Sequence, residues 1–143
     1  MKHLITFGLT GLITFFLISC KKSSLSANDT QAIILKKWNL LNDSTFIGVG
    51  LNNHPVNYTG QPGDYFDFKT DGYLYIKEGQ LLDTLSYTLT SDTTILIASF
   101  GIIFNSVPEI VHITNLGTHR VTINTPFILT PGGIFGRKVN LTR

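Results

Sequence analysis

The sequence has one cysteine, Cys20, and lacks the short motifs by which many enzymes are recognised. With a single thiol no disulfide can form within the chain, so a protein of an oxidising compartment must be held together by packing. No G-x-S-x-G nucleophile segment and no glycine-rich loop for phosphate is present. These absences argue against an enzyme.

Charge is also scarce, since Asp, Glu, Lys and Arg make up 14% of the chain and sum to a formal net charge of +2. This balance leaves no basic stripe of the kind a nucleic-acid-binding protein needs. His54, His112 and His119 form no H-x-H or H-x-x-x-H pair, so no metal site is predicted. We expect no other cofactor.

The longest uncharged run lies near the N-terminus, where residues 4–18 follow Lys2. The run is shorter than the ~20 residues of a spanning helix and is typical of a secretory leader. It ends in Leu17-Ile18-Ser19-Cys20, which resembles the lipobox of bacterial lipoproteins. The resemblance implies removal of residues 1–19 and a diacylglyceryl group on Cys20. The alternative is an ordinary signal peptide that happens to end at a cysteine.

Cleavage at this point leaves 124 of the 143 residues, enough for one domain. Two or three acyl chains, such as palmitate, would hold Cys20 in a membrane, because each buried methylene contributes about 0.8 kcal/mol. Residues 20–33 are polar and serine-rich, so we expect a flexible tether in which Asp29 or Thr30 caps a single turn over residues 31–35. No aspartate follows Cys20, and the lipobox resemblance then implies the outer membrane, with the domain facing the periplasm.

From residue 34 onward, short runs rich in Ile, Val, Thr, Tyr and Phe alternate with turn residues, which predicts strands. Asp71-Gly72 between two alternating runs predicts a tight hairpin. The eight expected strands cover residues 36–41, 65–69, 73–77, 82–90, 95–100, 109–114, 119–125 and 135–141, and residues 45–51 are a candidate ninth. Hairpin-length connections favour an all-β, antiparallel, eight-stranded up-and-down barrel, with a β-sandwich as the alternative.

The order of these features resembles the small lipocalin-like domains of bacterial lipoproteins. The resemblance covers residues 34–143 and rests on Cys20, on Trp38 in the first strand, and on an F-x-x-D-G hairpin at residues 68–72. It implies that Trp38 plugs the closed end of the barrel and that Arg137 or Arg143 lies across its ring. Lys36 stands where lipocalins usually carry glycine.

The resemblance also implies a cup that opens at the end opposite Trp38. The longest irregular stretch, residues 45–63, and two apolar segments, residues 101–104 and 127–135, are candidates for its mouth. The mouth residues that we expect are His54, Tyr58, Ile103, Phe104, Phe127 and Phe135. The alternatives are a plain connection for the first stretch and a cap over the core for the apolar segments.

Two functions are compatible with these patterns. In the first, a membrane-anchored lipoprotein holds a small hydrophobic or amphipathic ligand in its barrel. In the second, a structural or accessory lipoprotein presents its outer surface to an envelope protein and binds no small molecule. An eight-stranded barrel is wide enough to hold one small ligand or to be filled by its own side chains, so the sequence leaves both open.

Overall fold

The computed structural model describes residues 26–48, 54–101 and 108–143. Within these ranges the chain forms one helix and ten strands. The elements are α1 (Ala27–Ile34), β1 (Lys37–Ile47), β2 (His54–Thr59), β3 (Tyr65–Phe68), β4 (Tyr73–Glu78), β5 (Leu81–Leu89), β6 (Thr94–Ala98), β7 (Pro108–Leu116), β8 (Arg120–Asn124), β9 (Ile128–Thr130) and β10 (Gly133–Thr142). Cys20 and the leader lie outside the described residues. In the part that is described, no helix is both long and apolar enough to span a membrane.

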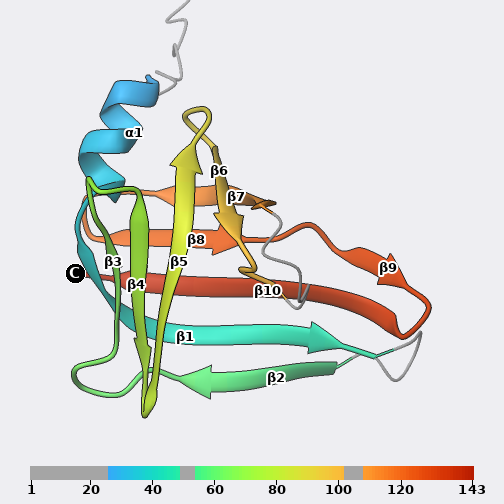
Figure 1. The fold of residues 1–143 in the computed structure, drawn as a ribbon. Coiled ribbons are helices and arrows are strands. Elements are labelled where there is room, and N and C mark those ends of the chain that lie inside the picture. The colour runs from blue at the N-terminus through green and yellow to red at the C-terminus, as the bar shows by residue number, and fades with distance from the viewer. Residues whose placement is uncertain (1–25, 49–53, 102–107) are drawn as a thin grey trace, which may run out of the picture.

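Eight strands form a closed antiparallel barrel, in which β1, β3 to β8 and β10 follow one another around the wall (Figure 1). The antiparallel pairing of β1 with β10 closes the ring. Closure removes the free edges that an open sheet would expose. The predicted eight-stranded up-and-down barrel is therefore confirmed, and the β-sandwich alternative is excluded.

The Asp71-Gly72 hairpin joins β3 to β4 as the alternation predicts. Gly72 has a φ of +84°, a conformation that glycine adopts without strain, and the Asp71 carboxylate accepts a hydrogen bond of 2.9 Å from the Tyr73 N–H. The turn sets the register that pairs Phe66 with Ile76. Both side chains consequently face the interior and are buried.

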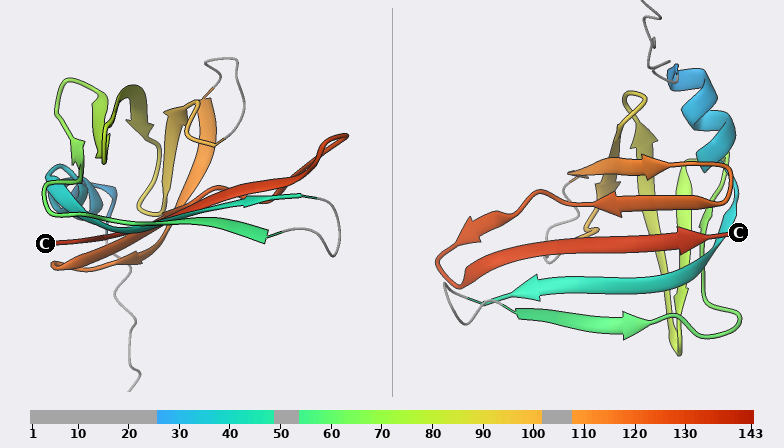
Figure 2. Two further views of the ribbon diagram at one scale, coloured as in Figure 1. Left: turned by 90° about the horizontal axis from the view of Figure 1, so that it is seen from below. Right: turned by 180° about the vertical axis from the view of Figure 1, so that it is seen from behind.

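Two strands outside the barrel were not predicted. β2 pairs with the second half of β1, and β9 pairs with the first residues of β10. The four strands form an extension that reaches beyond the barrel wall (Figure 2). The prediction of an irregular stretch over residues 45–63 is therefore wrong at residues 45–47, which belong to β1, and at residues 54–59, which form β2. Residues 127–135 contain β9 and the first residues of β10, which form a hairpin. Proline weakens the sequence signal of both strands, since Pro55 lies within β2 and Pro131 directly follows the three residues of β9.

A β-bulge at Leu41 decides which residues of β1 face the interior. Leu40 pairs with Leu141 and Asn42 with Asn140, so Leu41 is the extra residue and its side chain is 46% exposed. Before the bulge Trp38 and Leu40 point inward, and after it Asp43 does. A single inserted residue thus brings a carboxylate into the barrel.

Helix α1 covers one end of the barrel and is longer than expected. The Ser26 hydroxyl accepts from the Asp29 N–H, and the Asp29 carboxylate accepts from the Ser26 N–H, which is a capping box. Ser26, and not Asp29 or Thr30, is thus the N-cap. Ile34 and Thr30 are fully buried, and the Thr30 hydroxyl donates to the Asp92 carbonyl. Residues 27–33 of the predicted flexible tether (residues 20–33) are consequently part of a helix that packs against the barrel.

Candidate functional site

The interior of the described barrel is packed with its own side chains. Inward residues from all eight strands are buried, and many of them have no surface that a water molecule could reach, from outside or from an internal void. These fully enclosed barrel side chains are Trp38, Phe66, Leu74, Ile95, Ile97, Val111, Ile123 and Val139. Packing of this kind is normal for a protein core and leaves no room for a ligand among these residues.

Trp38 lies at the end that α1 covers. Its ring is fully buried, and its Nε1–H donates a hydrogen bond of 3.1 Å to the Ile34 carbonyl. Of the two arginines that the lipocalin resemblance offered, Arg143 lies over this ring, with its Cζ 5.6 Å from the ring centroid. Arg137 lies elsewhere, in contact with acidic residues inside the barrel.

The opposite end of the barrel contains an ion cluster formed by Arg137, Asp43 and Glu78. Arg137 donates to one Asp43 oxygen from Nε at 2.8 Å and from Nη2 at 2.5 Å, and Nη2 also lies 3.2 Å from Glu78 Oε1. Its Nη1 donates to the Phe100 carbonyl at 2.9 Å, and the Phe100 ring centroid is 4.6 Å from Cζ. The side chains of the three charged residues are at most 15% exposed.

Burial and the neighbouring carboxylate of Asp43 raise the pKa of Glu78 to about 7, although Arg137 opposes the shift. One Asp43 oxygen receives no N–H or O–H from the described protein groups. Burial lowers the pKa of Arg137, but the attraction of Asp43 and Glu78 outweighs this effect and raises it.

Asp43 and Glu78 were not among the predicted site residues, although the pattern of β4 indicates an inward position for Glu78. Glu78 continues the inward series of Leu74 and Ile76 at a period of two, just as Arg137 precedes Val139 and Leu141. A charged residue that extends an apolar series is a candidate for an inward position at the end of a barrel. Asp43 left no such signal, because the bulge at Leu41 breaks the period.

Of the six expected mouth residues, the structure describes the side chains of Tyr58, Phe127 and Phe135. Tyr58 donates a hydrogen bond of 2.6 Å to Asp64, and this bond and partial desolvation raise the pKa of Tyr58 to about 12. The same bond and the Gln61 N–H lower the pKa of Asp64. Phe135 is half-buried in β10. Ile103, Phe104 and the His54 side chain lie outside what the structure describes.

Phe127, the remaining mouth residue, lines a groove on the outside of the barrel. The groove has a volume of about 370 Å³ and lies on the face of β10 that carries Lys138, across the sheet from Val139. The rings of Phe46 and Phe127 meet edge to face with their centroids 5.5 Å apart. Thr114, Asn124 and Lys138 are also part of the lining. This volume falls within the range of small-molecule sites.

Gly136 explains how Phe127 can lie against the sheet. A Cβ at this position would come within 2.9 Å of the Phe127 ring, so any other residue would push the ring away. Gly136 also pairs directly with Phe46 across β1 and β10. The absence of a side chain at Gly136 therefore lets the Phe127 ring lie against the sheet beside Phe46, and Phe127 remains 66% exposed.

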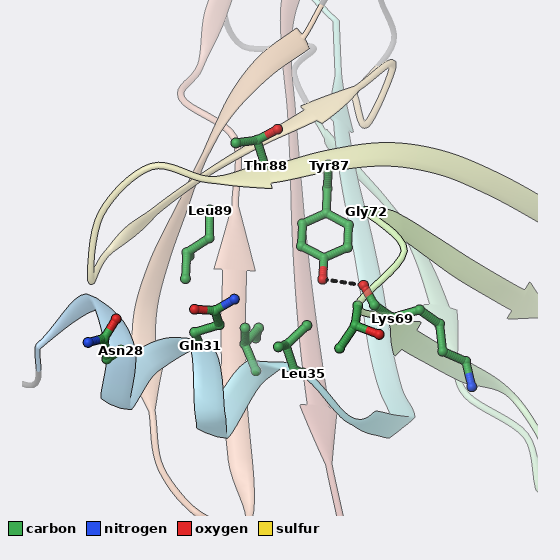
Figure 3. A pocket seen from close by; sticks show the side chains of 10 residues that line it. Asn28, Gln31, Leu35, Lys69, Gly72, Tyr87, Thr88 and Leu89 are labelled. Atoms are coloured by element: carbon green, nitrogen blue, oxygen red, sulfur yellow. Dashed lines mark hydrogen bonds between the residues drawn. The ribbon is translucent and has the colours of Figure 1, made fainter.

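A second pocket, of about 450 Å³, lies between α1 and β5 (Figure 3). Asn28, Gln31 and Thr88 contribute amide and hydroxyl groups, and Leu89 and Leu35 contribute apolar surface. The Tyr87 hydroxyl donates to the Lys69 carbonyl at 2.7 Å and bounds one side of the pocket. The polar lining suits an amphipathic molecule less well than the aromatic groove does.

Comparison with known proteins returned no relative. No protein-family model, no curated protein and no solved structure matches the chain. Among the residues that the structure describes, no three His, Cys, Asp or Glu side chains are grouped so that they could hold a metal ion.

Proposed function

We propose that this chain is a bacterial lipoprotein, anchored to the outer membrane by acyl chains on Cys20 and exposed to the periplasm. The support is the uncharged leader of residues 4–18, followed at once by a lipobox-like segment. The lipocalin-like assignment belongs to the same proposal. Its support is the closed eight-stranded barrel in which Arg143 lies over Trp38.

We further propose that the domain binds a small amphipathic molecule on the outside of its barrel. The observation that carries this proposal is the groove between Phe46 and Phe127, which combines aromatic walls with hydroxyl, amide and ammonium groups. A ligand within the packed part of the barrel would have to displace fully buried side chains such as Val139 and Ile97. Binding against Phe127 requires no such displacement, because its ring is already exposed.

The anchor is tested by intact-mass measurement of protein extracted from the membrane. We expect a mature chain that begins at an acylated Cys20 and lacks residues 1–19. An intact Met1 together with a free thiol would contradict this part of the proposal.

The binding site is tested with 1-naphthaleneacetamide, a neutral aromatic amphiphile, titrated into the mature protein in a non-ionic detergent. Detergent alone serves as the blank. We expect saturable binding that Phe127→Ala abolishes, whereas Leu82→Ala, which removes an exposed side chain from β5, leaves it unchanged. If the two variants bind equally well, the groove is not the site.

A protein partner is the second candidate function, and the extension favours it. Leu129 on β9 is 80% exposed and Val56 on β2 is 53% exposed, and both strands lie at edges of the extension. Exposed apolar residues on edge strands are typical of surfaces that pair with another chain. Crosslinking in intact cells distinguishes the two functions, because a ligand-binding domain needs no fixed neighbour.

A further inference from the structure

The groove beside Phe127 lies on a side of the molecule that exposes no carboxylate side chain. Residues 108–143 contain one acidic residue, Glu109, and β1 also contains one, Asp43. Both side chains are buried in the interior, 7% and 6% exposed. β2 contains no acidic residue. The outer faces of β1, β2, β7, β8 and β10 thus have no negative side chain with which to repel an anion.

Lys138 is the cation of this groove. Its side chain is exposed and lines the groove, and it forms no ion pair within the described part of the chain. The other basic residue of the lining, Arg137, already neutralises Asp43 inside the barrel. An ammonium group beside two aromatic rings, with no competing carboxylate, is complementary to a ligand that has an apolar body and one negative charge.

We propose that the groove formed by Phe46, Phe127 and Lys138 selects a small anionic amphiphile, such as an aromatic carboxylate, in which the rings hold the body and Lys138 pairs with the carboxylate. This inference rests on the proposed function, because it names the ligand class of the same site. Thr114 and Asn124 border the groove with groups that donate hydrogen bonds, and these suit an anion as well. A volume of about 370 Å³ fits a free small molecule and not a folded partner.

A pair of probes that differ only in charge tests the inference. 1-Naphthaleneacetate and 1-naphthaleneacetamide share one ring system, and only the first is an anion. Each is titrated into the mature protein in non-ionic detergent, and the ratio of the two dissociation constants is measured. We expect the acetate to bind roughly two- to five-fold more tightly at low salt, as for an exposed ion pair, and less so at high salt.

Matched variants separate Lys138 from the general charge of the surface. Lys138→Gln should bring the ratio to about one, chiefly by weakening the binding of the acetate. Arg120→Gln removes a cation from the end of β8 outside the groove lining and should leave the ratio unchanged. Both replaced side chains are exposed, so unfolding is not expected, and thermal melting verifies it.

The possible results distinguish the inference from the proposed function. Equal binding of the two probes, lost in Phe127→Ala, would overturn the choice of an anion and leave the groove as the binding site. Failure of both probes to bind would overturn the inference and the proposed function together. Self-association that Phe127→Ala abolishes, without probe binding, would assign the groove to a second copy of the chain and overturn both.

Discussion

At the scale of single residues, Arg137 introduces a positive charge into a barrel whose other inward side chains are mostly apolar. Removing two charges from water is costly, and replacement of a whole buried ion pair by apolar residues is often neutral for stability. Removal of one partner is different, because it leaves the other charge buried and uncompensated. Removal of one charged member of the cluster is therefore expected to destabilise the fold more than replacement of a whole ion pair.

Arg137→Leu should lower the free energy of unfolding by about 3 kcal/mol, near the lower end of the range for broken buried pairs, because the cluster keeps some contact with water. Urea denaturation measures this loss. Arg143→Gln removes the cation that lies over the Trp38 ring, at the exposed C-terminus. It should lower the free energy of unfolding by at most about 1 kcal/mol. Equal losses for the two variants would show that the cluster has no special role in stability.

The raised pKa of Glu78 predicts how the free energy of unfolding depends on pH. Its folded pKa of about 7 lies above the ordinary value of 4.5, so the folded state holds a proton that the unfolded state has lost between these values. The contribution of Glu78 is fully present below about pH 4.5, decreases as pH rises to about 7, and then levels off. Glu78→Gln keeps a neutral donor beside Asp43 and should flatten the decline. Urea midpoints from pH 5 to 8 measure the decline in stability. An equally steep decline in Glu78→Gln would show that other groups cause it.

At the scale of elements, α1 connects the barrel to the segment that leads back to Cys20. Ser26 caps this helix, and Ile34 and Thr30 dock it onto the barrel. Capping side chains contribute about 1 kcal/mol to a helix. The first turn, which has few buried contacts of its own, depends most on the cap.

Ser26→Ala should therefore reduce hydrogen-exchange protection of the α1 amides by about 1 kcal/mol, while the barrel amides keep their protection. Ser86→Ala, at an exposed position of β5, is the matched control and should change neither. Unchanged protection of α1 in the Ser26 variant would show that docking of Ile34 alone holds the helix.

The strands that sequence reasoning located are those whose signals are local. The Asp71-Gly72 turn and the alternation on both sides of it identify β3 and β4, because a hairpin is specified by residues close together in the chain. β9 has three residues between two prolines, and its partner lies on the far side of the turn into β10. Its strand character depends on that pairing more than on its own residues.

The candidate site was predicted less completely than the fold. Phe127 was predicted as a residue of the barrel mouth, but its position outside the barrel follows from Gly136 and from the ring contact with Phe46, and neither is visible in the sequence pattern. Asp43 faces inward only because Leu41 bulges out. Contacts that depend on a bulge or on distant strands lie beyond short-range periodicity.

In the whole molecule, the packed interior supports the fold, and the groove and the exposed charges lie on its outside. The closed barrel is filled in its described part and provides a rigid support, and the wall made of β1, β8 and β10 carries the groove on its outer face. Within the barrel strands and their turns, the exposed acidic side chains, such as Asp71 and Asp83, belong to the β3 to β6 half. The central claim is that ligands bind to the outer wall and not within the barrel.

Two-dimensional ¹⁵N–¹H spectra of the mature protein, recorded with and without 1-naphthaleneacetate, test this claim most directly. Each backbone amide, and the indole N–H of Trp38, reports on its own surroundings. We predict the largest shifts at Phe46, Phe127 and Lys138, with the Trp38 indole and the Ile97 amide unmoved. The opposite pattern, large shifts at Trp38 and Ile97 with an unchanged groove, would place the ligand inside the barrel and contradict the account.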